Sequence, residues 1–104
     1  MAEWVDVCAE SELTPGSRKV VVTEIGPIAV FNLGGDLHAI EDVCTHDGGE
    51  LASGELDGDQ IICPRHGARF CIRNGRALTP PAYEDIETFP VRVQGGMVQV
   101  DIDA

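Results

Sequence analysis

Two short clusters of cysteine and histidine constrain this chain of 104 residues more than any other feature of its sequence. The first spans 44–46 and reads Cys-Thr-His, and the second spans 63–66 and reads Cys-Pro-Arg-His. Two sulfur and two imidazole ligands suit a tetrahedral zinc ion. They equally suit a [2Fe-2S] centre with two cysteines on one iron and two histidines on the other.

The spacing of these ligands favours the two-iron centre. In zinc modules the two cysteines usually lie in one cluster and the two histidines in the other. Here each cluster supplies one of each, so each loop can place its thiolate on one iron and its imidazole on the other. The candidate ligands are therefore Cys44, His46, Cys63 and His66, and a zinc-binding structural or interaction module remains the alternative.

Both spacings resemble the signature of the Rieske family, which is C-x-H, a gap of similar length, and then C-x2-H. The flanking Pro64 and Gly67 agree with it. The resemblance implies one Rieske-type [2Fe-2S] cluster, in which the histidine-bound iron changes oxidation state. It also implies the Rieske fold of stacked antiparallel sheets, in which a loop containing proline covers the cluster; Pro80 and Pro81 match that loop.

The remaining sequence predicts an all-β chain, because short alternating or apolar segments are separated by glycine-rich turns and no helical period is present. Each ligand loop is expected to join neighbouring strands, so that two hairpin tips hold the cluster. Asn74-Gly75 is typical of a type I′ turn. Strands are expected over 3–8, 18–25, 27–33, 36–41, 60–62 and 68–72, followed by a final hairpin around Gly95-Gly96.

Length and charge limit the classes of partner. A chain of this size is expected to form one domain, 1–104, and a monomer. Its 7 basic and 18 acidic residues give a net charge of −11, which disfavours nucleic acid and anionic membranes as partners. No apolar run approaches the ~20 residues of a membrane-spanning helix, and no signal peptide is evident at the N-terminus, so we expect a cytoplasmic protein.

Several positions depart from the respiratory Rieske proteins. Their ligand loops are linked by a disulfide, and the matching positions here are Gly49 and Arg65. Their serine and tyrosine hydroxyls donate to the cluster sulfurs, whereas this chain has Ala68 and Phe70. Because hydrogen bonds to sulfur favour the reduced cluster, a low reduction potential is expected.

The resemblance therefore implies an electron-transfer protein without catalysis of its own. We expect a soluble ferredoxin that carries single electrons from a flavin-dependent reductase to a non-haem iron oxygenase, as a component of a dioxygenase system. The alternative is the small Rieske-like subunit of an NAD(P)H-dependent nitrite reductase. Cys8 and Cys71 are expected to be free, buried thiols, and a group of four arginines near the cluster is a candidate docking rim: Arg65, Arg69, Arg73 and Arg76.

Overall fold

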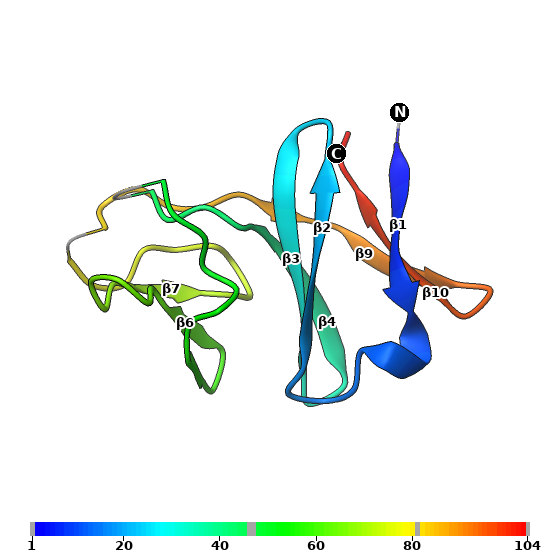
Figure 1. Cartoon of the computed structure of the whole chain (residues 1–104), viewed down its shortest axis with the longest axis horizontal. Helices are drawn as coiled ribbons and strands as arrows, with labels where there is room; N and C mark the ends of the chain where they lie inside the picture. Colours follow the sequence, from blue (N-terminus) through cyan, green and yellow to red (C-terminus); the bar gives the residue numbers. More distant parts are fainter. Residues whose placement is uncertain (1, 46–47, 81, 104) are drawn as a thin grey trace.

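A computed structural model describes residues 2–45, 48–80 and 82–103, which form three antiparallel sheets (Figure 1). Apart from one turn of 3-10 helix at Glu10–Glu12, the regular elements of this part of the chain are strands. The strands are β1 Trp4–Ala9, β2 Arg18–Thr23, β3 Gly26–Leu33, β4 Asp36–Glu41, β5 Leu56–Asp57, β6 Gln60–Ile62, β7 Arg69–Cys71, β8 Thr88–Phe89, β9 Val91–Gln94 and β10 Met97–Asp101.

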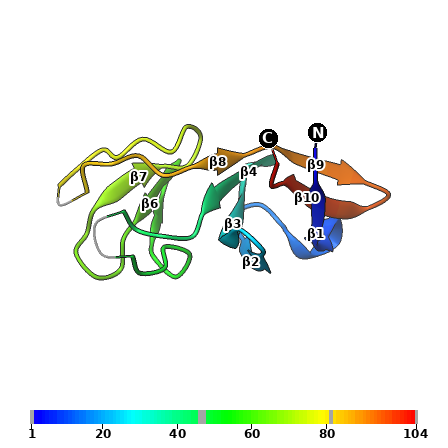
Figure 2. The same cartoon turned by 90° about the horizontal axis from the view of Figure 1, so that it is seen from above.

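The three sheets follow one another along the molecule (Figure 2). The terminal sheet has the order β1-β10-β9, so it pairs the first and last strands of the chain. The central sheet has the order β2-β3-β4-β8, and the distal sheet has the order β5-β6-β7. The all-β class and the stacked antiparallel sheets predicted from the sequence are confirmed.

Strand β3 joins the two halves of the molecule because both of its faces are buried. Ile28 and Val30 pack with Val98 and Val100 of the terminal sheet. The alternate residues on the other face, including Phe31, pack in a second core with the distal sheet and the two ligand loops. Successive side chains of a strand point to opposite faces, so a continuous apolar segment is what a doubly covered strand requires.

Two details of the predicted hairpins were wrong. A type I′ turn needs a positive φ at both central residues. Gly75 has φ 76°, but no non-glycine residue of the described chain has a positive φ, so Asn74 does not adopt that turn. Instead the Gly75 amide donates to the Cys71 carbonyl at 2.7 Å, in a wider turn that also pairs the Cys71 amide with the Arg76 carbonyl.

The second wrong detail concerns the first ligand loop. It leaves β4 in the central sheet and reaches β5 in the distal sheet, so it bridges two sheets and is not a hairpin tip. The second ligand loop does join the paired strands β6 and β7, as predicted. No helix in the described part of the chain is long and apolar enough to cross a membrane.

Candidate metal centre

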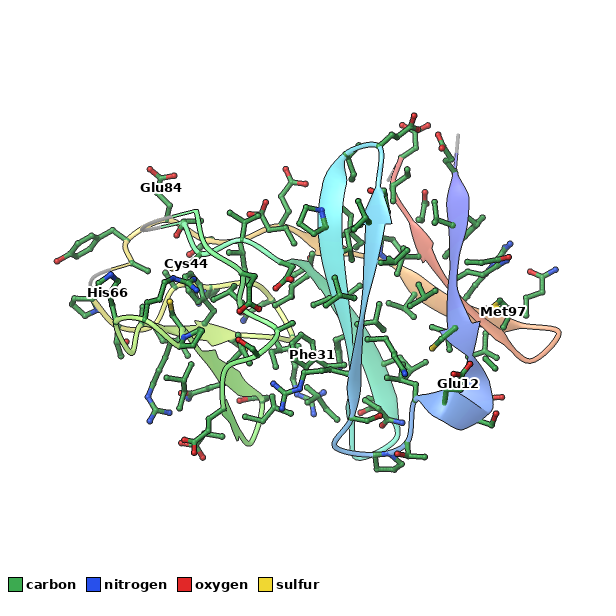
Figure 3. All side chains as sticks on the ribbon, in the orientation of Figure 1. Glu12, Phe31, Cys44, His66, Glu84 and Met97 are labelled. Atoms are coloured by element: carbon green, nitrogen blue, oxygen red, sulfur yellow. The ribbon has the colours of Figure 1, made fainter. Side chains whose placement is uncertain are left out.

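The two ligand loops meet at the distal end of the molecule. Figure 3 shows Cys44 and His66 at one end of the long axis, with Met97 of the terminal sheet toward the other end. Cys44 and Cys63 belong to the same buried core, together with Leu51, Ala68 and Phe70. The sequence therefore correctly predicted that segments sixteen residues apart come together here.

Both loops are closed by the same hydrogen bonds. The Cys44 carbonyl accepts from the Gly48 amide at 2.7 Å, and the Cys44 amide donates to the Gly49 carbonyl at 2.7 Å. Likewise, the Cys63 carbonyl accepts from the Gly67 amide at 3.0 Å, and its amide donates to the Ala68 carbonyl at 2.7 Å. Gly48 and Gly67 have φ values of 75° and 74°, a left-handed conformation that glycine adopts without strain.

The predicted ligands differ in their exposure. The side chains of Cys44 and Cys63 are 0% and 1% exposed, and neither is in a disulfide. His66 lies on the surface of its loop. His46 falls outside the described residues, so its placement rests on the sequence alone.

The structure describes three of the four predicted ligands. Among residues 2–45, 48–80 and 82–103, no three side chains of His, Cys, Asp or Glu are grouped as one metal ion would require. Cys44, Cys63 and His66 all belong to these ranges.

Two residues that the sequence reasoning missed hold the first ligand loop in place. Asp42 is buried, and its Oδ1 accepts from the amides of Leu51 and Ala52, both at 2.8 Å. Arg18, on β2, donates to the carbonyls of Ala52 at 2.8 Å and Gly54 at 2.5 Å. The segment after the loop is thus fixed to the central sheet by one carboxylate and one guanidinium.

The segment that follows the two prolines is attached to the same loop. The Thr45 hydroxyl donates to the Glu84 carbonyl at 2.7 Å. Of the two prolines expected to cover the cluster, Pro80 is exposed and Pro81 lies outside the described residues. The contact places 82–87 beside the first ligand loop, and the covering role stays a prediction.

The arginines near the site have different surroundings. Arg69 pairs with Asp57 at 2.8 Å. Arg73 lies 3.6 Å from Asp36 and 3.5 Å from Asp59. Arg65 instead reaches across to the first ligand loop, where its Nη2 lies 2.9 Å from the Glu50 carbonyl. Paired acids therefore account for two of the four arginines of the proposed docking rim.

The remaining cysteines lie in strands outside the ligand loops. Cys8 is half-buried in β1 against the core of the terminal sheet, and Cys71 is half-buried in β7; both thiols are free, as predicted, but neither is fully buried as expected. Burial, followed by the charge of Glu12, raises the pKa of the Cys8 thiol. A raised pKa makes this thiol less reactive, which agrees with a packing role.

Comparisons with known proteins agree with the family resemblance seen in the sequence. The family model described as the Rieske [2Fe-2S] domain matches residues 3–90. The ferredoxin component of the naphthalene 1,2-dioxygenase system of Pseudomonas aeruginosa is 34% identical over 100 residues, covering 96% of each chain. Ferredoxin CarAc of Metapseudomonas resinovorans is 40% identical over 98 residues, covering 93% of this chain and 92% of the relative.

Solved structures of similar fold include the same kind of ferredoxin. A chain in the complex of reduced oxygenase and oxidised ferredoxin in carbazole 1,9a-dioxygenase is 38% identical, with a TM-score of 0.88, covering 94% of this chain and 92% of the other. A putative NADH-dependent nitrite reductase small subunit from Mycobacterium tuberculosis is 26% identical, with a TM-score of 0.83, covering 100% and 98%. The fold is therefore shared by both kinds of protein that the sequence suggested, while the more similar sequences are ferredoxins.

Proposed function

The chain belongs to the Rieske [2Fe-2S] domain family, and on that basis we propose how its residues hold one Rieske-type cluster and pass electrons between two partners. We assign Cys44 and Cys63 to one iron, and His46 and His66 to the other. The observation that carries this assignment is the matched pair of loops, each closed by the same hydrogen bonds around a buried cysteine. His46 is assigned from its spacing alone.

The arrangement suits electron transfer. A bound cluster would supply single-electron redox chemistry. The buried Cys44 and Cys63 would hold the cluster, and the loop hydrogen bonds limit how far these two ligands can move when its charge changes. Since His66 is exposed, a partner can approach the imidazole edge directly.

The chain is an electron carrier to an oxygenase and is not itself the catalyst, in keeping with relatives that are named as ferredoxin components of dioxygenase systems. We propose in addition that the oxygenase contains non-haem iron and that a flavin-dependent reductase supplies the electrons. We further propose that residues 1–104 act as one domain, as a monomer, in the cytoplasm.

The proposed function is tested by following single electrons. The protein is reduced chemically without oxygen and mixed with a panel of oxidised non-haem iron oxygenases in a stopped-flow instrument. We expect the visible spectrum of the protein to return to its oxidised form with at least one oxygenase. Re-reduction by NADH should then require an added flavin reductase. If no oxygenase oxidises the protein and a large reductase subunit co-purifies with it, the nitrite reductase alternative is favoured.

The reduction potential gives a further prediction. Ala68, whose carbonyl accepts from the Cys63 amide, has no hydroxyl to offer the cluster, and neither has Phe70. We therefore expect a midpoint in the lower part of the Rieske range of about −150 to +300 mV. Ala68→Ser should raise it by roughly 40 mV if the new hydroxyl favours the reduced state by about 1 kcal/mol, since about 59 mV corresponds to a tenfold change for one electron.

Spectroelectrochemical titration measures the midpoint potentials of the wild type and of Ala68→Ser. Ala39→Ser is the matched control, because Ala39 is equally buried but packs in the core of the terminal sheet. Its midpoint should equal that of the wild type. A wild-type midpoint above about +100 mV would contradict the argument from missing hydroxyls.

A further inference from the structure

Arg65 bridges the two ligand loops. It lies on the second loop, between Cys63 and His66, and its Nη2 donates at 2.9 Å to the carbonyl of Glu50, at the end of the first loop. The same nitrogen lies 3.6 Å from the Sγ of Cys63, within hydrogen-bonding reach of sulfur. One guanidinium group thus contacts both loops and a proposed ligand atom.

The first loop has a space for this guanidinium because residue 49 is glycine. A Cβ built on Gly49 would lie 2.2 Å from Cζ and 2.2 Å from Nη2 of Arg65. Any larger side chain at this position must displace the arginine. Gly49 does not have a left-handed φ, so its backbone does not explain the glycine. The absence of a side chain at Gly49 and the length of Arg65 are therefore complementary.

We propose that Arg65, seated on Gly49, links the two ligand loops without a covalent bond and donates to the Cys63 sulfur. It is a positioning residue, and the inference rests on the proposed assignment of Cys63 as a ligand. Gly49 and Arg65 are the positions that match the disulfide of the respiratory Rieske proteins. A reversible polar contact therefore occupies the place of a covalent one.

The contact has two expected consequences. It restricts the movement of one loop relative to the other, which slows loss of the cluster. It also places a positive charge and a donor beside the thiolate, which favours the reduced, more negative state. Removal of a hydrogen bond from a charged group should therefore shorten the lifetime of the cluster by about tenfold.

The experiment compares four variants of the full chain: Arg65→Ala, Arg65→Lys, Gly49→Ala and the double variant Arg65→Ala with Gly49→Ala. Bleaching of the cluster by a chelator is timed, and the midpoint potential is measured. We expect Arg65→Ala and Gly49→Ala each to bleach about tenfold faster and to shift the midpoint to a more negative value. Arg65→Lys keeps the charge and should recover part of both losses. The double variant should be no worse than either single one, because both remove the same contact.

Arg76→Ala is the matched control. Arg76 is exposed, and its guanidinium makes no ion pair with the described residues, so its loss should leave bleaching and midpoint unchanged. Equal bleaching rates and midpoints for Arg65→Ala and Arg76→Ala would overturn the proposal. Fully additive effects of Gly49→Ala and Arg65→Ala would also overturn it.

Hydrogen exchange of the iron-free protein separates this inference from the proposed function. Arg65→Ala should raise amide exchange over 48–53 relative to Arg76→Ala, whether or not a cluster binds. If the wild-type protein never forms a cluster, the proposed function is wrong. The difference in amide exchange would still support the loop contact in that case. Unchanged exchange, together with normal cluster loading, would refute the loop contact alone.

Discussion

Cys63→Ser is expected to abolish the iron–sulfur centre, and Cys44→Ser should have the same effect. Each thiolate is proposed to bind the same iron, and both are buried, so no neighbouring solvent-exposed group can easily take their place. A serine hydroxyl is a poor ligand for an iron–sulfur cluster, which is held by thiolates. We expect a colourless protein with less than about a tenth of the wild-type iron, and no EPR signal after reduction.

The chain provides its own controls for this experiment. Cys8→Ser and Cys71→Ser make the same chemical change at free thiols in β1 and β7. Both variants should keep the full iron content and the visible spectrum of the wild type. Loss of the cluster in Cys71→Ser, with retention in Cys63→Ser, would show that the ligand assignment is wrong.

Asp42→Ala should lower the free energy of unfolding by about 3 kcal/mol. It removes the two hydrogen bonds that the buried carboxylate accepts, and each is worth about 1.5 kcal/mol or more. The amides of Leu51 and Ala52 would then be left without this acceptor. Asp42 also lies two residues before Cys44, so the first ligand loop should hold iron less firmly. Urea unfolding of the iron-free protein measures the first effect, and iron content measures the second.

Asp42→Asn distinguishes the hydrogen bonds from the charge. The asparagine oxygen can accept from the same two amides, so this variant should lose only about 1 kcal/mol. If Asp42→Ala were as stable as Asp42→Asn, the carboxylate would not be fixing the loop. Urea unfolding at several pH values would then be needed to find what holds 51–54.

Local signals in the sequence predicted the strands and the second ligand loop well. Strands β4 and β6 have the predicted bounds, because the turns at Gly34-Gly35 and Asp57-Gly58-Asp59 mark where each begins. The second ligand loop lies between two paired strands only a few residues away. For these elements the determining contacts are close in sequence, and residue types alone were sufficient.

Contacts between distant segments could not be predicted from the sequence. Nothing near Arg18 shows that its side chain reaches Ala52 and Gly54, 34 and 36 residues away. Asp42 has no local signal in the sequence that its carboxylate is buried and accepts from the amides of Leu51 and Ala52. The Asn74 turn failed although its contacts are local: Cys71 pairs with Arg76, which sets a wider loop than the Asn-Gly signal indicates.

Because β1 and β10 pair, both ends of the described chain leave from the terminal sheet, where the Ile102 amide donates to the Glu3 carbonyl at 3.0 Å. Both ends therefore lie away from the exposed His66 (Figures 1 and 3). A purification tag, or a tether to an electrode, can be attached at either terminus without covering the imidazole edge. A fusion that must fold back onto that edge needs a longer linker: roughly twelve extended residues span the 40 Å long axis.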